Sequence, residues 1–250
     1  MHIQCIRTNY ELAGSAELAD AWNRLASDVP FQSWDWLEAW WPTYGDAADR
    51  SDRVSELATV VVRDDAGRLI GLAPWYLENS PWHGRVLRFL GTHAVCSDYL
   101  GVLAEPGFEA DVAAALAVWL TEQSDAQWDL VELESVDPEN QVVCHLAAQM
   151  KSRGSLINLR PGPSCWQVAL PADWESYLKS LSPSHRKQVR RRQRRLFDTG
   201  RAILRAVDRE DERLAALEIL VDLHQRRQVS FGNKGRFASN SFLAFHQEVT

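Results

Sequence analysis

The segment LATVVVRDDAGRLIGLAPWYL, residues 57–77, indicates the fold class of this chain. Its first part, residues 57–62, is apolar and β-branched, which is typical of a buried strand. Residues 64–67 predict a hairpin turn, because Gly67 can adopt the positive φ that such turns need. Residues 69–77 then predict the returning strand. We therefore expect antiparallel β-structure in the first half of the chain.

Further strands are predicted on both sides of this hairpin. Residues 2–7 form a short β-type run at the N-terminus. A turn at residues 81–84 leads into a strand at 86–90, and residues 99–103 form another. Together these segments predict a mostly antiparallel meander.

Helices are predicted around the sheet. Residues 15–26 carry apolar side chains at the i, i+3, i+4 and i+7 spacing of an amphipathic helix. Ser33 is a suitable N-cap for a second helix. After Gly107 we expect helices and strands in alternation, namely a helix at 112–120, a strand at 128–133, a helix at 139–150 and strands at 156–159 and 166–170.

A second set of elements is predicted after Pro171. Asp173 and Ser182 are N-cap residues for two helices, and Gly200 is the C-cap of the second. A strand at 202–207 and two helices, at 210–228 and from Asn240 onward, follow. We therefore divide the chain into a first domain at 1–170, linker helices at 171–200 with a basic helix at 184–198, and the opening of a second domain at 201–250.

This element order predicts an α/β fold of the α+β type, with a mixed, mostly antiparallel sheet flanked by helices. Within it, SDYLGVL (97–103), LPADWESYLKSLSPSHRKQVRRRQRRLFDTG (170–200) and residues 224–245 resemble the CelD-like GNAT acetyltransferases. That family is linked to cellulose and exopolysaccharide biosynthesis and is distantly similar to the Fem-type aminoacyltransferases, which have two GNAT domains in tandem. The resemblance covers residues 30–250. It implies one complete GNAT domain followed by the first elements of a second.

The resemblance implies an acyltransferase that moves an acyl group from acetyl-coenzyme A to an amine or hydroxyl of a small-molecule, saccharide or peptide acceptor. In GNAT domains the coenzyme A pyrophosphate lies on backbone N–H groups where the fourth strand opens into the next helix. Here that junction, residues 102–109, contains Glu105 and Glu109, which repel phosphate, and Pro106, which lacks a donor. We therefore expect the donor to bind in a part of the second domain beyond residue 250, and little binding by these 250 residues alone.

The resemblance also names candidate site residues. Asp98 is a candidate general base or amine-orienting carboxylate, and Tyr99 a candidate general acid for the leaving thiolate. His224 is a third catalytic candidate, with Arg226 and Phe237 as substrate-binding residues. The alternatives are structural: a strand-end turn at Asp98 and Tyr99, and a packed core or interface histidine at His224.

The segment between Arg186 and Arg205 holds nine of the 27 Lys and Arg residues, in a chain whose net charge is −7. Arg186, Arg190 and Arg194 are candidate coenzyme A ligands, because a guanidinium binds phosphate bidentately. The alternative is a solvated helix between two domains. The acidic remainder and the lack of interleaved aromatic residues argue against nucleic acid, with tRNA suggested only by the distant similarity to Fem-type enzymes.

Other patterns narrow the function classes. The cysteines show neither CxxC nor metal-ligand spacing, so we expect reduced thiols, no metal site and a cytoplasmic protein. No apolar run reaches the ~18 residues of a membrane span. The tryptophans at 34, 36, 40 and 41 predict either core packing or a platform for sugar rings. The alternative to an enzyme is a non-catalytic interaction protein, with a degenerate GNAT domain whose basic helix docks an anionic partner.

Overall fold

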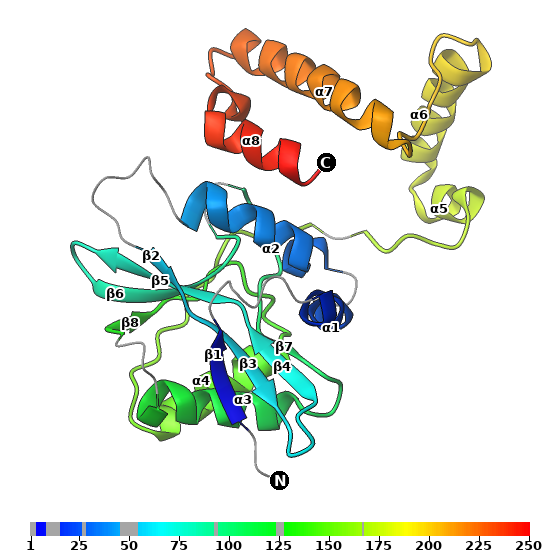
Figure 1. Cartoon of the computed structure of the whole chain (residues 1–250). Coiled ribbons are helices and arrows are strands. Elements are labelled where there is room, and N and C mark those ends of the chain that lie inside the picture. Colours follow the sequence, from blue (N-terminus) through cyan, green and yellow to red (C-terminus); the bar gives the residue numbers. More distant parts are fainter. Residues whose placement is uncertain are drawn as a thin grey trace. The chain divides into compact units, whose positions relative to one another are not determined.

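The computed structural model describes residues 4–8, 16–26, 29–45, 55–92, 95–123, 128–166 and 168–250 (Figure 1). Its contacts divide the chain into two compact units. One contains Met1–Gly162 and Leu220–Thr250, and the other contains Pro163–Ile219.

One four-stranded sheet of the first unit is entirely antiparallel. It consists of β1 (Gln4–Thr8), β3 (Thr59–Arg63), β4 (Leu69–Ala73) and β7 (Leu103–Ala104), in that order. The turn between β3 and β4 forms as predicted, because Asp64 accepts the backbone N–H groups of Ala66 and Arg68 and Gly67 adopts a φ of 78°. The hairpin expected from residues 57–77 is therefore confirmed as far as Ala73.

A second four-stranded sheet lies beside the first and is mixed. Its order is β2 (Ser55–Leu57), β5 (Trp75–Ser80), β6 (Gly84–Phe89) and β8 (Leu130–Val131), with β8 parallel to β6. The prediction of one continuous strand at 69–77 is wrong, since Pro74 divides it between the two sheets. Proline has no N–H for the ladder, and its carbonyl accepts from Leu90 at 2.8 Å instead.

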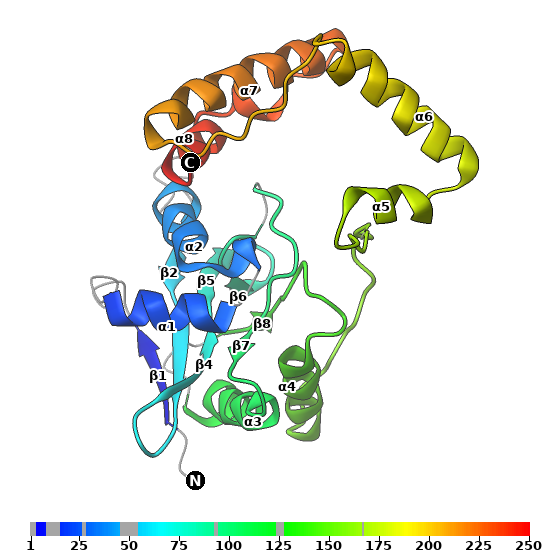
Figure 2. The same ribbon diagram turned by 90° about the vertical axis from the view of Figure 1, so that its right-hand side faces the viewer.

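Helices cover both faces of the sheets (Figure 2). Alternate residues of β3 point to opposite faces, so Val60 and Val62 join one core and Val61 the other. The first core is closed by α3 (Glu109–Val118) and α4 (Gln141–Ser152), and the second by α1 (Ala16–Ala26) and α2 (Trp34–Trp40).

Aromatic side chains fill the second core. Trp40 is 1% exposed and lies against Tyr76 with ring centroids 5.3 Å apart, while Trp34 meets Trp22 edge-on at 5.1 Å. Ser33 caps α2 as predicted by accepting the N–H of Trp36. The rings therefore pack against one another, and the buried Trp40 offers no exposed face to a sugar.

The remaining helices follow residue 173. The second unit contains α5 (Trp174–Ser180) and α6 (Pro183–Gln193), which continues as a wider π-type turn (Arg194–Asp198). A long helix α7 (Glu210–Ser230) leads to a 3₁₀ turn (Arg236–Ala238) and α8 (Asn240–Glu248). Phe245 of α8 is fully buried in the aromatic core, where it meets Trp36 at 4.8 Å.

Three predicted strands are wrong. Residues 156–159 and 202–207 form neither helix nor strand. The same holds for residue 166 and residues 168–170, whereas Gln167 lies outside the described residues. Leu156 is 102% exposed and Trp166 97%. An apolar run becomes a strand only where a neighbouring strand supplies the ladder. The strand predicted at 99–103 is likewise reduced to a parallel bridge between Leu100 and Val136 and the two residues of β7.

The part of the chain that is described is thus a mixed α/β structure with eight α-helices and two four-stranded sheets. None of the helices in these ranges combines the length and the apolar character needed to cross a bilayer.

Candidate functional site

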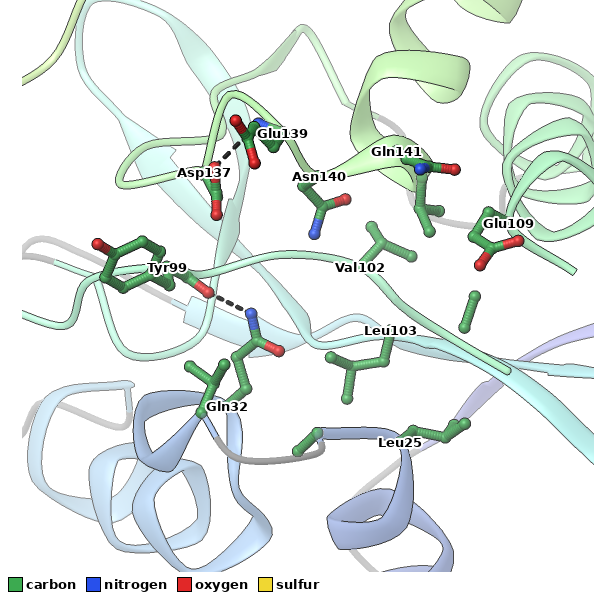
Figure 3. Close-up of a pocket in the computed structure, with 14 residues that line it drawn as sticks. Leu25, Gln32, Tyr99, Val102, Leu103, Glu109, Asp137, Glu139, Asn140 and Gln141 are labelled. Atoms are coloured by element: carbon green, nitrogen blue, oxygen red, sulfur yellow. Dashed lines mark hydrogen bonds between the residues drawn. The ribbon is translucent and has the colours of Figure 1, made fainter. Parts of the chain in front are cut away.

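A cavity of about 380 Å³ lies in the first unit, close to the start of α3 and of α4 (Figure 3). The end of α1, the 3₁₀ turn Pro30–Gln32, β7 and the loop before α4 all contribute to its wall. The lining residues are Leu25, Ala26, Val29, Gln32, Tyr99, Val102, Leu103, Ala104, Glu109, Asp137, Glu139, Asn140, Gln141 and Val142.

The side-chain amides of Gln32 and Asn140 approach the backbone at residues 99–101 from two different elements. The Nε2 of Gln32 donates to the carbonyl oxygen of Tyr99, and its Oε1 points into the cavity (Figure 3). Asn140 caps α4 by accepting the N–H of Val143 at 3.0 Å, which leaves its Nδ2 directed at the centre of the cavity. Gly101 lies between them and leaves the room that both amides need.

Carboxylates provide most of the remaining polar surface. Asp137 uses one oxygen to accept the N–H of Glu139 at 2.9 Å and directs the other into the cavity (Figure 3). Glu109 lines the cavity near the start of α3. Among the described lining residues none is Lys, Arg or His. The wall is therefore formally anionic, with neutral hydrogen-bonding amides and apolar side chains between the charges.

The junction before α3 is occupied by its own acidic side chains. Glu109 accepts the N–H of Gly107 at 2.9 Å, and Glu105 pairs with Arg24 at the same distance. A helix N-terminus attracts anions through free N–H groups and the helix dipole. Here the carboxylate of Glu109 accepts the N–H of Gly107, which directly precedes the N-cap residue Phe108. The expectation that residues 102–109 are a poor phosphate site stays a prediction.

Tyr99 lines this cavity, whereas the neighbouring Asp98 is not among the lining residues. Tyr99 adopts a left-handed φ of 57° and lines the wall, with its ring toward the rim (Figure 3). Asp98 is exposed. The preceding Ser97 is buried and accepts from Trp36 Nε1 at 2.9 Å, which ties the segment to α2. A tyrosine in this conformation is unusual and strained, so the surrounding contacts hold it there.

His224 and Phe237 come together on α7 and the turn after it. Their rings meet edge-on at 5.2 Å, and His246 meets the same Phe237 at 5.4 Å. Arg226 is exposed and paired with Asp222 at 2.8 Å. The structure thus places two of the three residues in one aromatic cluster and turns Arg226 away into an ion pair on the helix surface.

Tyr44 joins the aromatic core next to this cluster. It packs on Phe245 with ring centroids 6.0 Å apart. Burial raises the pKa of the Tyr44 hydroxyl, and the positive charge of Arg236 partly offsets that rise.

The candidate phosphate ligands belong to the second unit. Arg186 donates to the backbone carbonyls of Leu178 at 2.8 Å, Lys179 at 3.0 Å and Leu181 at 3.1 Å, which satisfies the C-terminal end of α5. Arg190 pairs with Glu175 at 2.6 Å, and Arg194 is exposed. Two of the three guanidinium groups are therefore engaged in joining α5 to α6.

Sequence reasoning missed Gln32, Asp137 and Asn140 as lining residues. Asn140 stands at the start of a predicted helix, where an N-cap signal was available. No sequence pattern marked Gln32 as a lining residue, because its hydrogen bond to Tyr99 joins residues 67 positions apart.

The site offers no arrangement for a metal ion. Within the described ranges, no group of three or more His, Cys, Asp or Glu side chains is placed to hold one. Comparisons with protein-family models, curated proteins and solved structures find no match to this chain.

Proposed function

We propose that the protein is a GNAT-type acyltransferase, which transfers an acyl group from acetyl-coenzyme A to an amine or hydroxyl acceptor, with polysaccharide or cell-envelope biosynthesis as the setting that the family resemblance implies. The observation that carries the proposal is the cavity at the ends of β7 and of the loop before α4. It lies within an order of elements, β1, α1, α2, antiparallel strands, α3, β8 and α4, that follows the expected order as far as α4 but lacks the two strands expected after it.

The chemistry needs few protein groups. A nitrogen or oxygen of the acceptor attacks the thioester carbonyl, a new C–N or C–O bond forms, the C–S bond breaks, and the acceptor proton is passed on while the thiolate is protonated. Catalysis then consists of positioning and proton transfer. In the proposal, Asp98 takes the proton or orients the acceptor, and Tyr99 protonates the thiolate, with His224 as the other candidate base.

In the proposal, acetyl-coenzyme A does not bind at the loop before α3. Glu109 accepts the N–H of Gly107 and Glu105 pairs with Arg24, so two carboxylates lie at the loop where a pyrophosphate would have to bind. The cavity of the first unit is accordingly assigned to the acceptor, and Arg186, Arg190 and Arg194 are the candidate ligands of acetyl-coenzyme A.

The decisive experiment is a calorimetric titration of the protein with acetyl-coenzyme A, followed by a thiol-release assay with amine and hydroxyl acceptors. We expect saturable donor binding and release of coenzyme A that depends on the acceptor. Absence of donor binding would remove the enzyme proposal.

A second candidate is docking of an anionic partner by the basic helix. Lys187, Arg191, Arg192 and Arg195 on α6 and its π-type extension are exposed. Such binding depends on charge and falls with rising salt. Affinity for a model polyanion such as heparin that does not change between low and high salt would contradict this candidate.

A further inference from the structure

We propose that the cavity of the first unit is a cation-selective pocket, which holds a protonated ammonium or guanidinium group as the anchor of the acceptor. The assignment of this ligand as the acyl acceptor rests on the proposed function. The charge selectivity of the pocket does not, because it follows from the lining residues alone.

The first argument is the charge of the wall. Asp137 directs one carboxylate oxygen inward, and Glu109 and Glu139 also line the cavity (Figure 3). Arg24, which directly precedes the lining residue Leu25 in the chain, is paired with Glu105 at 2.9 Å. Carboxylates that face a concave, partly enclosed space attract a cation more strongly than they would on an open surface.

The second argument is an acceptor oxygen that faces the cavity from a largely buried residue. Gln32 is 7% exposed, and its Nε2 is used by the carbonyl of Tyr99. Its Oε1 points into the cavity, and no donor to it is found among the described residues (Figure 3). This oxygen is accessible from the cavity, so an N–H group of a ligand can donate to it.

The chemistry of the ligand follows from these groups together. Acceptors converge at Gln32 and Asp137, while Asn140 contributes one donor through Nδ2. Apolar side chains such as Val102 and Leu103 complete the wall. A cationic N–H donor attached to a short carbon chain fits this set. A carboxylate or phosphate would meet like charge, and the carboxylates are not grouped as metal ligands.

The test uses three probes with the same four-carbon chain and different end groups: 1,4-diaminobutane, 1,4-butanediol and succinate. Binding to the ¹⁵N-labelled chain is followed by amide chemical shifts. We expect diaminobutane to shift the signals of Gly101 and Asn140 and to bind at least about tenfold more tightly than butanediol. Succinate should leave these signals unchanged.

A matched pair of variants locates the effect. Asp137→Asn keeps an oxygen for the N–H of Glu139 but removes the charge, so diaminobutane affinity should fall about tenfold. Asp64→Asn is the control, because Asp64 caps a turn in the same way but does not line the cavity. If Asp137→Asn does not fold, titration of the unaltered protein in about 1 M salt replaces it, since salt screens the attraction.

Several results would overturn the proposal. Equal affinity for butanediol would mean that hydroxyl groups, and not charge, are recognised. Succinate binding at Gly101 and Asn140 would reverse the assigned sign. Lack of any shift with diaminobutane, or an equal loss in both variants, would show that the pocket does not select cations. None of these results depends on acyl transfer, which the thiol-release assay measures separately.

Discussion

Gly101 illustrates how one residue without a side chain maintains the cavity. A Cβ at this position would lie 2.5 Å from Nδ2 of Asn140 and 3.4 Å from Nε2 of Gln32. Gly101→Ala should therefore displace Asn140 and weaken its cap on α4, at a cost of about 1–3 kcal/mol in the free energy of unfolding. Urea denaturation measures this loss.

Gly162→Ala is the matched control for that substitution. A Cβ there has no neighbour within 4 Å, so the free energy of unfolding should change by less than about 0.5 kcal/mol. Equal stability of the two variants would show that Asn140 and Gln32 do not need the space above Gly101.

Asp173 connects one carboxylate to the pH dependence of a helix. Hydrogen bonds from the hydroxyl and then the N–H of Ser176 hold the pKa of this carboxyl below its usual value of 3.8. The ionised form is thus favoured in the folded state. Its stabilisation of α5 is complete above the unfolded-state pKa and is lost as the pH falls through the lower folded-state pKa.

A carbon-detected NMR titration checks this prediction. The carboxyl carbon of Asp173 should titrate below 3.8, and the helical chemical shifts of α5 should decline over the same pH range. Asp173→Asn retains the cap but should remove that pH dependence. A measured pKa at or above 3.8 would contradict the capping interaction.

At the scale of the elements, one side chain of α8 is fully buried in the aromatic core of the first unit. Phe245 is 0% exposed and meets Trp36 at 4.8 Å and Tyr44 at 6.0 Å. Phe245→Ala should cost about 3–5 kcal/mol and detach α8 from α2. Chemical denaturation and tryptophan fluorescence report the two effects.

Phe231→Ala provides the comparison for α8. Phe231 is 68% exposed beyond the end of α7, so its truncation should change the free energy of unfolding by no more than about 0.5 kcal/mol. A similarly small effect at Phe245 would mean that α8 is held by other contacts.

At the scale of the whole molecule, the segment at residues 155–171 contains the boundary between the two compact units, at Gly162 and Pro163. Its described residues form neither helix nor strand, and Trp166 is 97% exposed. Proteases cut exposed backbone that lacks hydrogen-bonded structure. Limited chymotrypsin treatment should therefore cleave first at Trp166, as mass spectrometry of the fragments would show.

Trp82 serves as the internal control in that experiment. It is 89% exposed, but it lies in the turn that joins β5 to β6. Cleavage there should be much slower than at Trp166. Faster cleavage at Trp82 would show that exposure alone, and not local hydrogen bonding, decides the site.

The sequence by itself determined the local features of this protein. Ser33, Asp173 and Ser182 cap their helices as predicted, and Gly67 and Gly200 adopt positive φ. Each of these features depends on hydrogen bonds or backbone conformation within a few residues. The residue types present in the segment therefore suffice to predict it.

Only the tertiary structure decided which segments meet. The division of residues 69–77 at Pro74, the unpaired state of residues 156–159 and 202–207, and the cavity between Gln32 and Asn140 all depend on partners distant in the chain. Strand pairing and pocket walls require such partners, and the apolar pattern of a segment does not identify them. The chain thus specifies its caps and turns locally, whereas its sheets and its candidate site arise from packing.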